Sequence, residues 1–199
     1  MDRTLHWIRF SWCFLLAVLL LGAGPWVESA WCADATTVYN RYNIHVQKLV
    51  TNRGEKIQAS YANYTDPGPI HIIIPAGSQL TVKKVSKKLI VFHWPEKNLE
   101  VQFEFHEVRM GMDVKTYLDK IASPTPVSFA KLSKIDRKGI AEGKAYVGMS
   151  REGVMAALGY PAAHRTPSLE ASTYIYWKNR YGTVAVHFNQ QGKVIQVVN

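Results

Sequence analysis

The sequence predicts an α+β protein with a strand-rich front half and a back half in which one helix packs on a three-stranded antiparallel meander. Three observations lead to this prediction. Residues 38–107 hold short apolar segments of strand length, separated by turn signals. Residues 150–159 have the caps and apolar spacing of a short helix. Three segments of alternating character, divided by turns, follow that helix.

The first 35 residues have the three-part pattern of a secretory signal peptide. A basic start precedes an apolar run of 14 residues over positions 10–23, and small residues follow it. A membrane-spanning helix needs roughly 20 apolar residues, so the run is short for an anchor, although an uncleaved anchor stays an alternative. We expect cleavage after Ala35, or alternatively after Ala33, and hence a periplasmic or secreted protein.

Both cysteines of the chain, Cys13 and Cys32, lie in this leader. A lipid-modified cysteine needs a small residue before it, and Trp31 disfavours lipid anchoring through Cys32. After cleavage the chain would hold no thiol, and therefore no disulfide, thiolate nucleophile or cysteine-bound metal.

The chain has a formal net charge of +9, and residues 36–199 hold 22 Lys and Arg against 12 Asp and Glu. Long-range attraction favours anionic partners. For an exported protein these are acidic envelope proteins, an anionic membrane surface or a cell-wall polymer, and nucleic acid is not expected. The alternative is that the charge serves solubility alone.

Residues 36–110 are predicted to form a β domain. Gly54 can take a positive φ in the turn over residues 51–54, and apolar and polar residues alternate at period two from residue 99. The expected strands lie at 38–50, 57–64, 70–74, 80–85, 89–92 and 99–105.

Residues 111–139 are predicted as a helical linker. Asp113 can cap a helix that ends at the prolines of residues 123–126. Beyond these prolines, Gly139 and Gly143 weaken any long helix.

Residues 140–199 are predicted as a separate α/β domain. Ser150 can cap a helix, Gly159 can close it in a left-handed conformation, and Pro161 prevents its continuation. The strands of the meander are expected at 173–177, 183–188 and 193–198. In the first of them we expect Ile175 and Trp177 to face the helix.

Four short motifs in the back half occur in a recognisable order: GMS at 148–150, LGYP at 158–161, YW at 176–177 and GKV at 192–194. In this order they resemble the small outer-membrane assembly lipoproteins of the SmpA/OmlA type, and the helix-on-meander unit also occurs in proteinaceous β-lactamase inhibitors. The resemblance covers residues 140–198. It implies a non-catalytic domain that binds other proteins through the helix, the meander and their loops. The chain departs from those lipoproteins in its disfavoured lipid anchor and its strand-rich first half.

Two further stretches carry resemblances. The run IPAGSQLTVKKVSKKLIVFHW at 74–94 is similar to bacterial SH3-like modules, which implies a small SH3-like barrel or sandwich over residues 36–110. The run GYPAAHRTPSLEASTYIYWKNRY at 159–181 resembles exported bacterial proteins that join such a front to this back half. The resemblance to that group implies no particular activity.

The loop after the predicted helix is a candidate docking element. Arg165 can present a planar fork to a carboxylate or phosphate, and His164 can titrate near neutral pH. The alternative is a plain connection in which Arg165 pairs with Glu152 or Glu170.

An aromatic and basic cluster follows in the first strand of the meander and its turn. Tyr, Trp and Arg are the usual anchors of protein interfaces, so Tyr176, Trp177, Arg180 and Tyr181 are candidate partner-binding residues. The alternative is simple packing on the sheet.

Four lysines, Lys83, Lys84, Lys87 and Lys88, are expected to bracket a turn at residues 85–86. Lysines at a hairpin tip can contact an anionic surface. The alternative is protection of an edge strand by charge.

The sequence offers no clear catalytic, metal or cofactor site. The chain lacks a Gly-x-Ser-x-Gly motif, and no histidines have ligand spacing on one helix. The sequence therefore predicts a non-catalytic exported envelope protein that acts as an interaction or adaptor module. Binding of a cell wall or an anionic glycan is the alternative, and an enzyme ranks third.

Overall fold

The computed structural model describes residues 36–52 and 54–199 of the chain. The expected signal peptide with its cleavage sites and Cys32, and Arg53 of the expected turn, lie outside the described residues. These described residues belong to one compact unit. Within the described part, no helix is long and apolar enough to cross a membrane.

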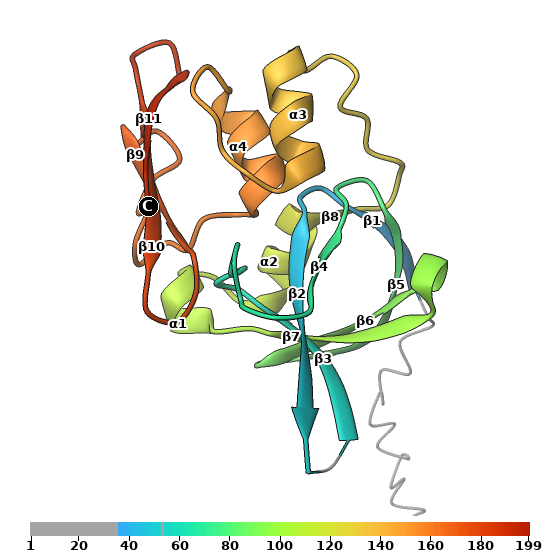
Figure 1. Ribbon diagram of the computed structural model, residues 1–199. Coiled ribbons are helices and arrows are strands. Elements are labelled where there is room, and N and C mark those ends of the chain that lie inside the picture. Colours follow the sequence, from blue (N-terminus) through green and yellow to red (C-terminus); the bar gives the residue numbers. More distant parts are fainter. Residues whose placement is uncertain (1–35, 53) are drawn as a thin grey trace, which may run out of the picture. The chain divides into compact units, whose positions relative to one another are not determined.

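A curled sheet of eight strands dominates this unit (Figure 1). Its strands are β1 (Thr36–Asn40), β2 (Ile44–Thr51), β3 (Gly54–Ser60), β4 (His71–Ile74), β5 (Gln79–Ser86), β6 (Leu89–Trp94), β7 (Leu99–Glu104) and β8 (Ala122–Ser123). They follow the order β4-β2-β3-β7-β6-β5-β1-β8. All neighbours are antiparallel except β3 and β7, which are parallel. The α+β class and the strand-rich front half are confirmed, and the SH3-like architecture stays a prediction.

The single strand expected over residues 38–50 is instead two strands, β1 and β2, which lie far apart in the strand order. Asparagines on either side of the break bond to a distant turn. The Nδ2 of Asn40 donates to the carbonyl of Pro75 at 2.9 Å. The Oδ1 of Asn43 accepts from the N–H of Ala76 at 2.7 Å. These bonds hold the chain where it crosses from one part of the sheet to the other.

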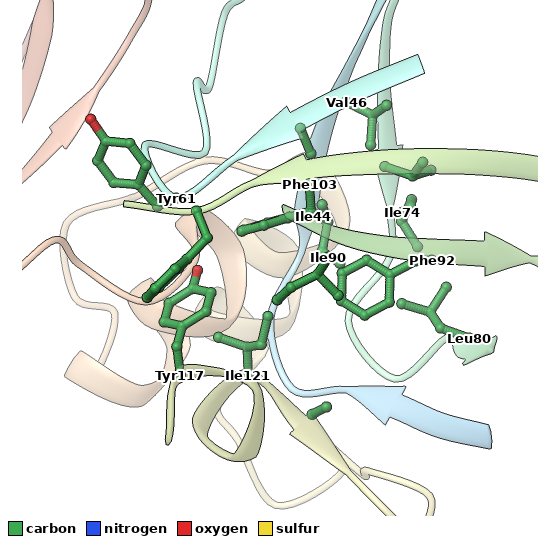
Figure 2. Close-up of a cluster of buried hydrophobic side chains, with 14 of the residues drawn as sticks. Ile44, Val46, Tyr61, Ile74, Leu80, Ile90, Phe92, Phe103, Tyr117 and Ile121 are labelled. Carbon is green, nitrogen blue, oxygen red and sulfur yellow. The ribbon is translucent and has the colours of Figure 1, made fainter. Parts of the chain in front are cut away.

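The sheet and two helices enclose the larger buried cluster (Figure 2). α1 (Glu107–Met110) and α2 (Val114–Ile121) contribute Met110, Tyr117 and Ile121 to it. Asp113 caps α2 as predicted, since its Oδ1 accepts from the N–H groups of the second and third residues after it. A short 3₁₀ turn, η1 (Pro95–Lys97), joins β6 to β7.

The helix-on-meander prediction is confirmed. α3 (Lys134–Glu142) and α4 (Arg151–Leu158) lie on one side of a sheet made of β9 (Thr173–Trp177), β10 (Thr183–Phe188) and β11 (Val194–Val198) (Figure 1). The strand order is β11-β10-β9 and both pairs are antiparallel. Val154 and Leu158 pack in a second buried cluster with Val186. Gly159 follows α4 at φ 96° and ψ 177°, a positive φ outside the left-handed helical region.

A buried carboxylate organises the first turns of both helices. Asp136, which is 1% exposed, accepts from the Oγ of Ser133 at 2.7 Å and from the N–H of Ser150 at 2.7 Å. Burial works to raise the pKa of Asp136, but the hydrogen bonds outweigh it and the pKa is lowered. The capping box of α3 and the start of α4 therefore share one side chain.

The front half binds the ends of these helices through buried amides. The Nδ2 of Asn43 donates to the carbonyl of Ile140 in α3 at 2.6 Å. The Nδ2 of Asn63 donates to the carbonyl of Leu158, the last residue of α4, at 2.8 Å. Carbonyls at a helix end have no partner within the helix, so these asparagines satisfy them and join the two buried clusters.

The expected orientation of β9 is wrong. Tyr174 and Tyr176 are 0% and 3% exposed and lie in the second cluster, whereas Ile175 and Trp177 are half-buried on the opposite face. The register pairs both tyrosines with buried valines of β10. Since paired residues of antiparallel strands share a face, the tyrosines must lie beside those valines.

Candidate functional site

Side chains from four separate segments gather around the end of β9, and we call them the aromatic–arginine surface. They come from the end of β3 and its loop, from α1 and the residue before it, from the loop after α4, and from β9 with its turn. Its members surround the buried ring of Tyr61 and are Tyr64, His106, Arg109, His164, Arg165, Trp177, Arg180 and Tyr181.

Arg165 lies over the indole of Trp177, with 5.0 Å between the guanidinium carbon and the ring centroid. His164 stacks near the same indole, at 6.4 Å between centroids. A guanidinium stacked on a ring keeps its in-plane N–H groups free for a carboxylate. The docking loop and the aromatic strand predicted from sequence are thus in contact.

The front half contributes a second arginine. Arg109 of α1 lies over the ring of Tyr61 at 5.8 Å, and its Nη1 donates to the Tyr61 hydroxyl. The backbone carbonyl of Arg109 accepts from the N–H of His164 at 3.1 Å. Rings of His106 and His164 flank Tyr61 at 5.9 and 6.5 Å. These contacts join α1 to the loop after α4.

A third arginine extends the surface over the turn after β9. Arg180 lies 5.4 Å from the ring centroid of Tyr181, which is 88% exposed. Burial raises the pKa of Tyr64, and so do Tyr61 and Glu104, while Arg109 and Arg180 act in the opposite sense. Both arginines are therefore close enough to Tyr64 to affect its charge.

Within the described part of the chain, none of the three arginines forms an ion pair. The ion pair that occurs there joins Lys48 and Glu55 at 2.7 Å. The alternative pairing of Arg165 with Glu152 or Glu170 is therefore absent. Arginines held over rings and without a carboxylate partner have unused donors.

Five of the six residues predicted to bind a partner belong to this surface: His164, Arg165, Trp177, Arg180 and Tyr181. Tyr176 does not, because it is buried among core residues, and it is withdrawn as a surface residue. The sequence alone did not predict Tyr61, Tyr64, His106 and Arg109. No local pattern identifies them, because only the fold of the front half brings them to β9.

The four lysines lie on the hairpin of β5 and β6, and all are exposed. The turn is at Lys87 and Lys88, not at residues 85–86 as expected. A register shift between Val82 and Lys84 moves the strand by one position, and Val85 is 40% exposed beside the lysines. The tip of the β5–β6 hairpin is therefore basic and carries one exposed apolar residue.

Two histidines, the buried His45 and the partly exposed His71, form a pair beside α4. The Nε2 of His45 lies 3.1 Å from the carbonyl of Ala157, and its Nδ1 lies 3.0 Å from the Nε2 of His71. A carbonyl only accepts, so the Nε2 of His45 is the protonated nitrogen and its Nδ1 accepts from His71. Burial lowers the pKa of His45 to about 4, although the bond to Ala157 opposes this. The described residues contain no group of three or more His, Cys, Asp or Glu that could hold a metal ion.

Comparison with known proteins gives no relative: no family model, no curated protein and no solved structure matches the chain.

Proposed function

We propose that this protein is a non-catalytic exported envelope protein that binds an acidic partner protein through the aromatic–arginine surface. The observation that carries the proposal is the set of three arginines, Arg109, Arg165 and Arg180, each over an aromatic ring and none paired with a carboxylate in the described chain. Binding, rather than catalysis, is the function that such donors and rings supply.

The chemistry of the surface selects the partner class. A guanidinium binds a carboxylate through two parallel hydrogen bonds, and exposed Tyr181 offers apolar area beside it. The net charge of +9 adds long-range attraction for an acidic protein. Export follows from the expected signal peptide and belongs to the same proposal, as does an adaptor role in envelope or outer-membrane assembly.

Photo-crosslinking in intact cells tests the proposal. A reactive residue replaces Arg165 in one strain, Tyr181 in a second and Lys87, on the β5–β6 hairpin, in a control strain. We expect one envelope protein to be captured at positions 165 and 181 and not at position 87. Capture of no protein at the first two positions, from a folded and exported chain, would contradict the proposal.

The exposed lysine hairpin supports a second candidate function, binding of an anionic cell-wall polymer or glycan. All four lysines are exposed, and none is in an ion pair within the described residues. Co-sedimentation with purified wall polymer should then fall with rising salt and should be lost in the double variant Lys87→Glu, Lys88→Glu. Equal sedimentation of that double variant would rule this candidate out.

A further inference from the structure

A small polar pocket lies on the eight-stranded sheet, next to the aromatic–arginine surface. Its volume is about 220 Å³, which is below the roughly 300–1,000 Å³ of pockets for drug-sized ligands. Residues of β2, β3 and β7 form its floor, and the segment after β3 forms its walls together with α1. The side chains that line it include Gln47, Gln58, Ser60, Tyr61, Tyr64, Glu104 and Arg109. The pocket therefore suits a small ligand and offers it mainly polar groups.

Strand register produces the polar floor of this pocket. Gln47 of β2 pairs with Gln58 of β3, and Ser60 of β3 pairs with Glu104 of β7. Since paired residues share a face and side chains alternate along each strand, these four side chains lie on one face of the sheet. Phe103, the neighbour of Glu104 in β7, is 2% exposed in the larger buried cluster. The polar floor therefore faces away from that cluster.

Hydrogen bonds orient the polar groups of the floor. The Nε2 of Gln47 donates to the carbonyl of Pro67 at 2.8 Å, and the Nε2 of Gln58 donates to the Oε2 of Glu104 at 3.3 Å. Each glutamine keeps its carbonyl oxygen as an acceptor. A carboxylate and two amide oxygens on one floor are a suitable setting for an ammonium group.

The wall of the pocket supplies a cation. The Nη1 of Arg109 donates to the hydroxyl of Tyr61, and Figure 2 shows this hydroxyl directed away from the other labelled side chains of the core. A guanidinium has five N–H donors, so Arg109 keeps others for a carboxylate. The N–H of Tyr61 donates to the backbone carbonyl of Glu104 at 2.8 Å, which holds this wall beside the floor. Burial raises the pKa of Tyr64, with Glu104 adding to the rise and Arg109 opposing it, so both charges lie near that side chain.

The charges of the lining select the class of ligand. Glu104 and Arg109 are both exposed, and neither forms an ion pair among the described residues. His45 also lines the pocket, but burial lowers its pKa to about 4 and the ring is neutral at pH 7. A ligand with only a negative charge would be repelled by Glu104, and one with only a positive charge by Arg109. A small molecule that carries both charges satisfies both groups.

We propose that this pocket binds a free α-amino acid as its zwitterion, with the carboxylate on Arg109 and the ammonium group on Glu104. The carbonyl oxygens of Gln47 and Gln58 accept further hydrogen bonds from the ammonium group. The pocket shares Arg109 and Tyr64 with the aromatic–arginine surface, but the inference does not depend on the partner protein proposed above.

Isothermal titration of the purified chain with each of the standard amino acids tests the inference. We expect at least one to bind, and shifts of the side-chain amide resonances of Gln47 and Gln58 to locate it in the pocket. The N-acetyl derivative of that amino acid lacks the positive charge and its carboxamide lacks the negative one. Each derivative should therefore bind about tenfold more weakly or worse. This comparison uses the wild-type chain and holds even where a variant fails to fold.

Four variants separate the pocket from other effects. Glu104→Gln removes the anion and Arg109→Gln removes the cation, so each should weaken amino-acid binding about tenfold or more. Glu100→Gln makes the same change on the same face of β7 but outside the pocket, and it should leave amino-acid binding unchanged. Arg165→Gln should also leave it unchanged while weakening the binding of a partner protein, so the pocket and the proposed function are tested independently.

Three results would overturn the inference. They are binding of no amino acid, equal binding of the N-acetyl derivative or the carboxamide, and unchanged binding by Glu104→Gln. Binding of a neutral monosaccharide in place of amino acids would overturn it as well, since a neutral ligand needs neither charge of the pocket.

Discussion

His45 shows how the setting of one residue links stability to pH. Burial lowers its pKa from 6.5 to about 4, so the unfolded chain takes up a proton on His45 at a higher pH than the folded chain does. The free energy of unfolding should therefore be fully retained above pH 6.5 and should fall as the pH decreases toward 4. The change is about 3 kcal/mol for a shift of this size. His71, whose pKa burial also lowers, acts in the same direction.

Urea unfolding at pH 7 and at pH 4.5 measures this dependence. His45→Gln removes the titrating ring, so the variant should lose most of the difference in unfolding free energy between the two pH values. A variant that keeps the full difference would show that other groups cause it.

Close packing between α3 and α4 leaves no room for a side chain at Gly153. A Cβ on Gly153 would lie 2.1 Å from the Oδ1 of Asp136 and 2.6 Å from its Cγ. Asp136 is held by hydrogen bonds from both helix starts, so it has no room to move. Gly153→Ala should lower the free energy of unfolding by about 1–3 kcal/mol, measured by chemical denaturation.

Gly182 provides the matched control, because the nearest atom to an added Cβ there lies 3.7 Å away. Gly182→Ala should change the unfolding free energy by roughly 0.5 kcal/mol or less. Equal losses in the two variants would contradict close packing of the helices at Gly153.

The elements themselves could largely be predicted from sequence where local signals are strong. Asp113 and Ser150 cap their helices as expected, and the strands of the meander begin and end within one residue of the expected positions. The break between β1 and β2 could not be predicted, because it depends on bonds from Asn40 and Asn43 to a turn more than thirty residues away. The prediction of which face of β9 is buried was wrong for a related reason, since strand register, not composition, decides which side chains are buried.

The sequence predicts the part of the candidate site that the back half supplies, and misses the part that the front half supplies. Arg165, Trp177 and Arg180 are close in sequence, so one stretch identifies them. Tyr61 and Arg109 join them through the parallel pairing of β3 with β7 and the docking of α1 beside the loop after α4. No spacing along the chain encodes such non-local pairing, so the surface predicted from sequence was confined to the back half.

Unpaired arginines of the aromatic–arginine surface are proposed to bind an acidic partner. The most direct measurement is the affinity of the protein captured at position 165 for the wild type and for Arg109→Ala, Arg165→Ala and Arg180→Ala, together with the melting temperature of each. We predict that each variant binds about tenfold more weakly or worse, at about 1.4 kcal/mol per tenfold. The melting temperature should stay unchanged in Arg165→Ala and Arg180→Ala, whereas Arg109→Ala also loses its hydrogen bond to the buried Tyr61. Unchanged affinity in all three variants, or weaker binding only in step with a lower melting temperature, would contradict the claim.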